Sequence, residues 1–166
     1  KFSPIMKAVI EFAHNGGKVL GICNGFQMLL EAHLLPGAMK RNSNVHFISK
    51  FHPLKVINTN NAFLRNCKVG EILNVPIAHG EGSYYIDESG LQELYANEQV
   101  LLTYTDAQGN SDNPNGSIDS IACICNKSKN VFEFCNAMVP TPFPSKSIII
   151  GDDSLSAFDF DGGVSN

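Results

Sequence analysis

The stretch Gly21-Ile22-Cys23-Asn24-Gly25-Phe26-Gln27 places a cysteine in a tight turn between an apolar strand and an apolar helix. It has the form of the G-x-S-x-G nucleophile elbow, with a thiol in place of the hydroxyl. Such an elbow presents a reactive side chain at the top of a parallel sheet. The expected strand covers residues 18–22, and the expected helix runs from Phe26 to Leu35, before Pro36-Gly37. The sequence therefore predicts an α/β fold with a cysteine elbow.

Cys23 is the candidate nucleophile, and its surroundings favour that role. The backbone N–H of Asn24 opens the helix and can help to hold an oxyanion. A helix N-terminus also favours the reactive, ionised form of a nearby thiol. The alternative is a structural role, since free cysteine is among the most buried residue types. We expect Cys23 in a strained conformation at the end of a central strand that is parallel to its neighbours.

The composition excludes several classes of function. A chain of 166 residues is long enough for one domain with a hydrophobic core. The net charge of −4, without a basic block, argues against a nucleic-acid partner. No apolar run is long enough to span a membrane, and no signal-peptide pattern is present, so we expect no membrane partner. The five cysteines have irregular spacing that suits a reducing cytoplasm and matches no metal-ligand pattern, so we expect no metal.

The rest of the chain reads as further helices and strands. Ser3 is the expected cap of a first helix with Pro4 at its first position. The other expected elements are a β-rich excursion over 45–78, a helix over 88–97, a strand over 100–104, a hairpin of 118–125 with 130–134, a strand over 147–150 and a helix over 152–158. Residues 159–166 are expected to form a mobile tail.

Four stretches, taken in order, resemble the class I glutamine amidotransferases. More narrowly, they resemble the glutaminase subunit of phosphoribosylformylglycinamidine synthase, an enzyme of purine biosynthesis. These stretches are Ser3-Pro4-Ile5-Met6, the elbow continued to Leu29, Pro76-Ile77-Ala78-His79-Gly80-Glu81-Gly82, and Asn113-Pro114-Asn115-Gly116-Ser117 followed by Ile121-Ala122. The resemblance implies a three-layer, flavodoxin-like α/β domain over residues 1–158, incomplete because its first strands are missing.

The resemblance also implies a reaction. Cys23 would attack the side-chain amide of L-glutamine and release ammonia, leaving a thioester that water hydrolyses. Gln27 would help to hold the glutamine, and His79, Gly80 and Glu81 would lie near it. The ammonia would pass to a synthetase subunit, which uses ATP and Mg to convert formylglycinamide ribonucleotide to its amidine. This chain would bind no cofactor itself, and a small third subunit is a further implied partner.

The chain departs from the family at two places that matter for catalysis. Family members carry a further segment before the position of Ser3, which includes a loop that donates a second oxyanion N–H. They also carry a Met-Met-Pro-His-Pro-Glu segment with the general base and its orienting acid, where this chain has Thr141 and Phe143. Threonine cannot take a proton from a thiol at neutral pH, and phenylalanine cannot orient a base.

The sequence therefore leaves several interpretations open. The first is a glutaminase subunit represented by an incomplete or altered chain. The second is a non-catalytic relative that binds the synthetase or glutamine without hydrolysis. The third is another cysteine-elbow enzyme on the same type of sheet, against which the ordered motifs count. A sequence error or frameshift after Phe134 would also explain the missing base and acid.

Overall fold

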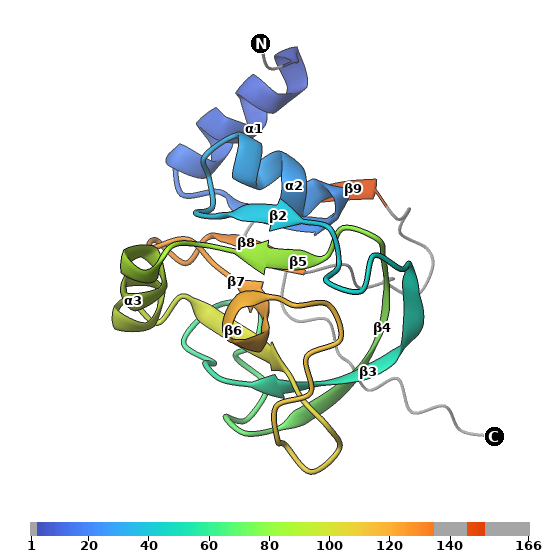
Figure 1. The fold of residues 1–166 in the computed structure, drawn as a ribbon. Helices are drawn as coiled ribbons and strands as arrows, with labels where there is room; N and C mark the ends of the chain where they lie inside the picture. The colour runs from blue at the N-terminus through green and yellow to red at the C-terminus, as the bar shows by residue number, and fades with distance from the viewer. Residues whose placement is uncertain (1–2, 135–145, 152–166) are drawn as a thin grey trace, which may run out of the picture.

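The computed structural model describes residues 3–134 and 146–151 (Figure 1). The expected helix over 152–158 and the expected tail over 159–166 lie outside these residues, and so do Thr141 and Phe143. Within the described part of the chain, no helix combines the length and the apolar character needed to cross a membrane.

The chain begins with the helix–strand–helix unit that the elbow predicts. Helix α1 covers Pro4–His14, strand β1 covers Lys18–Cys23, and helix α2 covers Asn24–Glu31. Ser3 caps α1 as expected, because its Oγ accepts a hydrogen bond from the Met6 N–H at 3.3 Å.

Helix α2 ends four residues earlier than the apolar pattern predicts. His33 takes a left-handed φ of 56°, which breaks the helical path. The N–H groups of Leu34 and Leu35 both donate to the carbonyl oxygen of Leu29, at 3.0 and 3.3 Å. The side chains of Leu34 and Leu35 are buried although they lie beyond the helix end. The apolar pattern therefore predicted their burial correctly, but not their secondary structure.

Strand β1 is the central strand of a three-stranded sheet with the order β8-β1-β9. It is parallel to β8 (Val131–Phe134), as predicted, but antiparallel to β9 (Lys146–Gly151). The prediction that both neighbours are parallel was therefore wrong for β9. A continuous apolar run predicts burial on both faces, but it does not set the direction of each neighbouring strand.

A second, four-stranded sheet is antiparallel throughout, with the order β4-β3-β6-β7. Its strands are β3 (Ile48–Val56), β4 (Ile72–His79), β6 (Val100–Tyr104) and β7 (Ile121–Ile124). The β-rich excursion over 45–78 is thus confirmed, and β6 has the predicted bounds. The two strands of the hairpin expected from 118–125 and 130–134 belong to different sheets, because β7 joins this sheet and β8 joins the other, but one antiparallel bridge, between Cys125 and Phe132, links the two segments.

Several shorter elements belong to neither of these two sheets. Strand β2 (Ala38–Lys40) pairs with β5 (Ser83–Tyr85), helix α3 covers Glu88–Ala96, and a short 3₁₀ helix, η1, covers Ile118–Ser120. Helix α3 matches the predicted helix over 88–97 to within one residue.

Side chains on the two faces of β1 pack in two different hydrophobic cores. Val19 packs in a core with residues of α1 and α2, whereas Leu20 and Ile22 pack in a core with residues of the second sheet. The helices α1 and α2 therefore lie on one face of the small sheet, and the second sheet lies on the other (Figure 1). The predicted α/β class is confirmed, and in the described residues the layers are the helices, the small sheet and the second sheet.

Gly21 lies where α2 packs against β1, so a substitution at this position tests whether the elbow requires glycine. A Cβ there would lie 2.5 Å from Leu29 Cδ1 and 2.9 Å from the backbone carbonyl carbon of Gly25. Because the Gly25 backbone cannot rotate away, we expect Gly21→Ala to lower the free energy of unfolding by about 1–3 kcal/mol, as overpacking does. Urea unfolding measures this loss.

The matched control for this substitution is Gly80→Ala. Its added Cβ would meet its nearest neighbour, Phe47 Cδ2, at an ordinary 3.7 Å. We expect it to change the free energy of unfolding by no more than about 0.5 kcal/mol. Equal losses in the two variants would contradict a steric requirement for glycine at position 21.

Candidate functional site

The elbow is built around the backbone of Cys23. This residue ends β1 and is also the N-cap of α2, with φ 53° and ψ −113°. A non-glycine residue in this region carries about 1–3 kcal/mol of strain, which persists only when the surrounding structure fixes it. Here β1 is paired on both sides, and α2 packs closely on Gly21. Cys23 thus has the strained conformation expected of an elbow residue.

Cys23 lines a small cavity together with all the other residues proposed for the site from the sequence. The cavity has a volume of about 210 Å³ and is lined by Cys23, Asn24, Gln27, Met39, Phe47, Ala78, His79, Gly80 and Glu81. One wall comes from the elbow and the first turns of α2, and another comes from the end of β4 and the loop after it. The volume suits a small ligand, since pockets for drug-sized molecules measure about 300–1,000 Å³.

His79 is the buried ionisable residue among those that line the cavity. Its side chain is 3% exposed, and burial lowers its pKa from 6.5 to about 4, with a further contribution from nearby His52. Its Nδ1 lies 3.0 Å from Asn42 Oδ1, whereas its Nε2 is buried with no hydrogen-bond partner among the described residues. At neutral pH the His79 ring is therefore uncharged.

The glycines around His79 have different reasons for being glycine. A Cβ on Gly82 would lie 2.3 Å from His79 Nδ1, so only glycine lets the backbone pass this close to the ring. A Cβ on Gly80 would have open space around it, apart from Phe47 at 3.7 Å. Glycine is therefore sterically required at position 82, whereas a Cβ could be accommodated at position 80.

Met39, Phe47 and Asn42 were not predicted from the sequence. Met39 and Phe47 line the cavity, and Asn42 is a buried residue that binds the loop of residues 79–82. Asn42 stands in the polar run Arg41-Asn42-Ser43-Asn44, which is typical of an exposed turn. Nothing in that pattern distinguishes the one buried asparagine from its neighbours.

Two carboxyl groups lie near the elbow in different surroundings. Glu81 is exposed on the cavity wall and pairs with Arg41, with 3.8 Å between Oε1 and Nε, a surface contact of little energetic value. Glu133 is fully buried on β8 opposite Gly21, and burial raises its pKa well above 4.5. Its Oε1 accepts from the Ile124 N–H at 3.0 Å, but Glu133 is not among the residues that line the cavity.

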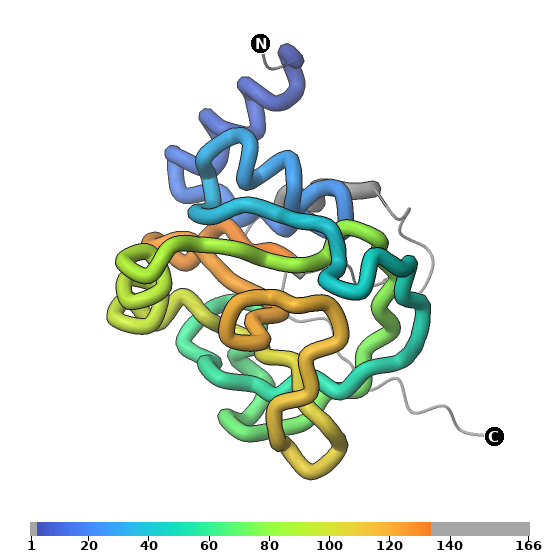
Figure 2. The backbone as a smooth tube through the Cα atoms, in the orientation of Figure 1, coloured from blue at the N-terminus to red at the C-terminus, as the bar shows by residue number. Residues whose placement is uncertain are grey.

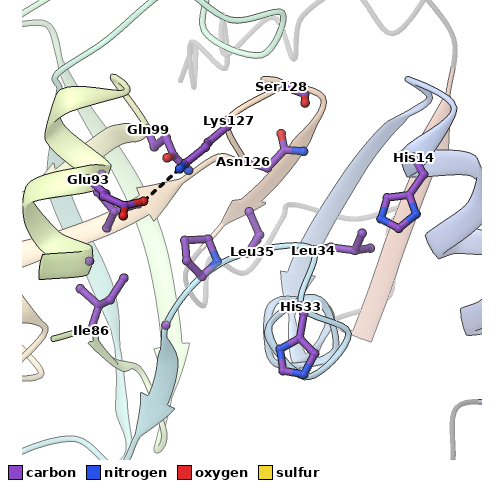
Figure 3. Close-up of a pocket in the computed structure, with 14 residues that line it drawn as sticks. His14, His33, Leu34, Leu35, Ile86, Glu93, Gln99, Asn126, Lys127 and Ser128 are labelled. Atoms are coloured by element: carbon purple, nitrogen blue, oxygen red, sulfur yellow. Dashed lines mark hydrogen bonds and ion pairs between the residues drawn. The ribbon is translucent and has the colours of Figure 1, made fainter.

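A second cavity, of about 430 Å³, lies apart from the elbow (Figure 3). It is bordered by the end of α1, the segment after α2, helix α3 and the turn of residues 126–128. Glu93 and Lys127 form an ion pair across it, with 2.9 Å between Oε2 and Nζ (Figure 3). None of the residues proposed for the site from the sequence lines this cavity, so the chemistry points to the smaller one.

The comparisons with known proteins agree with the motifs. The model of the CobB/CobQ-like glutamine amidotransferase domain matches residues 2–133. The chain is 62% identical to the phosphoribosylformylglycinamidine synthase subunit PurQ of Sulfurimonas denitrificans, over 92% of this chain and 66% of the relative. It is 44% identical to PurQ of Salinibacter ruber, over 96% of this chain and 68% of the relative.

A solved structure is also similar. The structure of PurLQS from Thermotoga maritima matches with a TM-score of 0.68 and 36% sequence identity, over 79% of this chain and 55% of that chain. This chain spans slightly less than two thirds of the length of the PurQ subunits from Sulfurimonas denitrificans and Wolinella succinogenes. By its domain match and its identity to these subunits, the chain belongs to the CobB/CobQ-like glutamine amidotransferase domain family and, within it, to the PurQ family.

Proposed function

We propose that this chain is the glutaminase subunit of phosphoribosylformylglycinamidine synthase and that Cys23 is its nucleophile. The observation that carries the proposal is the strained elbow, which presents Cys23 at a cavity of about 210 Å³ lined by Gln27, His79, Gly80 and Glu81. These are the residues that the family resemblance assigns to the glutamine site. The names of the relatives, which are subunits of this synthase, support the same function.

The proposed reaction is acyl transfer through a thioester. The Cys23 thiolate attacks the carbon of the glutamine side-chain amide, and the backbone N–H of Asn24 helps to stabilise the negative oxygen of the tetrahedral intermediate. The carbon–nitrogen bond then breaks, and the nitrogen takes up a proton and leaves as ammonia. Water attacks the glutamyl thioester, which releases glutamate and restores the thiol.

Gln27, His79, Gly80 and Glu81 are proposed to hold the glutamine. Gln27 lies one helical turn after Cys23 on α2, on the side that borders the cavity. The neutral ring of His79 borders the cavity and adds no charge next to the ligand. Glu81 adds an exposed carboxylate at the cavity wall, next to which an ammonium group is favoured.

We propose that the ammonia passes to a synthetase subunit, which uses ATP and Mg to form the amidine of formylglycinamide ribonucleotide. The name PurLQS, carried by the similar structure from Thermotoga maritima, supports an assembly with other subunits, and a small third subunit is part of the proposal. We expect this chain to bind no cofactor of its own. A cytoplasmic location is proposed because the irregular spacing of the five cysteines suits a reducing compartment.

A non-catalytic role is the second candidate, and one observation favours it. Thr141 and Phe143 stand where the family has its general base and orienting acid. A chain of this kind would still bind glutamine or the synthetase through the same cavity. Measurements of thiol reactivity and of turnover separate the two candidates.

Selective alkylation tests the proposed nucleophile. We expect limiting iodoacetamide to label Cys23 before the other four cysteines, because the elbow exposes it at a cavity while Cys123 and Cys125 are fully buried. Burial also raises the pKa of Cys125 to about 11, which disfavours its thiolate. Mass spectrometry of the labelled peptides identifies the site.

L-glutamine should slow this labelling of Cys23, whereas D-glutamine at the same concentration should not. Cys67 provides the internal comparison, because it is also partly exposed and burial raises the pKa of its thiol. Preferential labelling of Cys67 or Cys135, or labelling of Cys23 that ignores L-glutamine, would remove the support for a glutamine site at the elbow.

A further inference from the structure

Asn42 is the residue that ties the loop of residues 79–82 to the rest of the fold. Its side chain is 1% exposed and makes four hydrogen bonds. The Nδ2 group donates to the carbonyl oxygens of His46 at 2.7 Å and of His79 at 2.9 Å. The Oδ1 atom lies 3.0 Å from the Gly82 N–H and 3.0 Å from His79 Nδ1. Both the Nδ2 group and the Oδ1 atom of Asn42 therefore have two hydrogen-bond partners each.

These contacts fix the orientation of the Asn42 amide. Two carbonyl oxygens face Nδ2 and a backbone N–H faces Oδ1, so a flipped amide would place acceptors against acceptors. With Oδ1 as the acceptor, the partner atom His79 Nδ1 has to carry the hydrogen. The lone pair of the neutral ring is then on Nε2, the buried atom that has no partner among the described residues.

The backbone around Asn42 strengthens the same connection. The Asn42 N–H donates to the Gly80 carbonyl oxygen at 3.1 Å, and on the other side Asn115 Nδ2 donates to the Gly82 carbonyl oxygen at 2.7 Å. The segment after β2 thus runs beside the loop after β4, as Figure 2 shows for the teal and green parts of the tube. Every residue of the loop except Glu81 has a hydrogen bond to one of the two asparagines.

We propose that Asn42 is a positioning residue, which holds His79 in its Nδ1-protonated tautomer and keeps residues 79–82 on the wall of the Cys23 cavity. Asn42 does not line the cavity, so it acts through His79 and the loop. The inference rests on the proposed function for its role in glutamine recognition. The tautomer and the loop contacts stand on geometry alone.

Asn42→Asp is the informative substitution. It keeps the shape and the Oδ1 acceptor, but it loses both donors and places a carboxylate beside two carbonyl oxygens. We expect the rate at which Cys23 reacts with a chloroketone analogue of glutamine to fall about 10- to 100-fold, as misplacement of a positioning group predicts. The rate with iodoacetamide, which needs no positioning, should change less than about twofold by the same reasoning.

Asn130→Asp is the matched control. Asn130 is also a buried asparagine whose Nδ2 donates to two carbonyl oxygens, those of Ala13 and Gly17, both at 2.8 Å. It directly precedes β8 and lies beside the opposite end of β1 from Cys23. This variant should lose stability in the same way, but it should keep the ratio of the two alkylation rates.

A second variant covers the outcome in which Asn42→Asp does not fold. Gly82→Ala leaves Asn42 intact but places a Cβ 2.3 Å from His79 Nδ1, so the ring and the loop backbone cannot both keep their positions. It should reduce the preference for the glutamine analogue in the same direction. An unchanged ratio of rates in the folded variants would overturn the role of Asn42 in recognition.

Nitrogen NMR of the His79 ring in the unmodified protein tests the tautomer independently of glutamine. We expect the shifts of an Nδ1-protonated ring, and a higher pKa of His79 in Asn42→Asp because a carboxylate then faces it. An Nε2-protonated ring would overturn the proposal. If the unmodified protein shows no preference for the glutamine analogue, the proposed function fails, and the NMR result alone decides the inference about Asn42.

Discussion

Ammonia release from L-glutamine should rise by about 10²- to 10⁴-fold when Thr141→His and Phe143→Glu are introduced together, the range that a general base contributes. The physical reason is that Cys23 has to give up a proton before it attacks, and the leaving nitrogen has to receive one. Thr141 and Phe143, which by the family resemblance take the place of a histidine and a glutamate, cannot exchange protons at neutral pH. The assay measures ammonia with and without a synthetase subunit.

The control for this gain is the same pair of substitutions combined with Cys23→Ala. Without the thiol no thioester forms, so turnover should return to the background of the unmodified chain. Thr141→His alone should give only part of the gain, because the glutamate orients the base. Turnover by the unmodified chain at the level of the doubly substituted one would mean that the base lies elsewhere, and His79→Ala would then be measured.

The elbow was predictable because it is local. Strand, turn and helix follow one another within residues 18–31, and each has its own sequence signal. The signals are an apolar run for the strand, glycines at positions 21 and 25 for the turn, and an amphipathic pattern for the helix. The clash of a Cβ on Gly21 with Leu29 and Gly25 explains why the first of these glycines is required. The same close packing of α2 on β1 therefore explains the glycine of the motif and the strained backbone of Cys23.

The cavity opposite the elbow could be predicted only by resemblance. His79, Gly80 and Glu81 lie more than fifty positions after Cys23, and their approach depends on the pairing of β3 with β4. No periodicity in the sequence gives that pairing. The contacts of Asn42 depend on it as well, so a buried asparagine in a polar run had no signal of its own.

The direction of β9 illustrates a further limit. Its apolar residues predicted a strand, and a strand is present at Lys146–Gly151. Parallel and antiparallel partners of a central strand have the same apolar pattern, so the pattern could not predict that β9 runs against β1. Sequence patterns of this kind predict burial more securely than they predict topology.

Acid should destabilise the fold through His79. The pKa of His79 is about 4 in the folded protein, below its ordinary value of 6.5, so the folded state binds fewer protons than the unfolded state between these values. Its contribution to stability is therefore complete above pH 6.5 and is lost as the pH falls toward 4. At about 1.4 kcal/mol per pKa unit, the loss amounts to about 3 kcal/mol.

The comparison of the unmodified protein with His79→Asn isolates this contribution. Burial lowers the pKa of His52 too, which adds to the loss in acid, whereas the raised pKa of Glu133 makes the fold more stable as the pH falls. Both effects are common to the two proteins and cancel in their difference. Urea unfolding at about pH 7.5, 6.0 and 4.5 should show the advantage of the unmodified protein over His79→Asn shrinking by about 2–3 kcal/mol toward acid. An advantage that stays constant with pH would mean that the ring accepts a proton in the folded state as readily as in water, and that the cavity around Cys23 is open to solvent at His79.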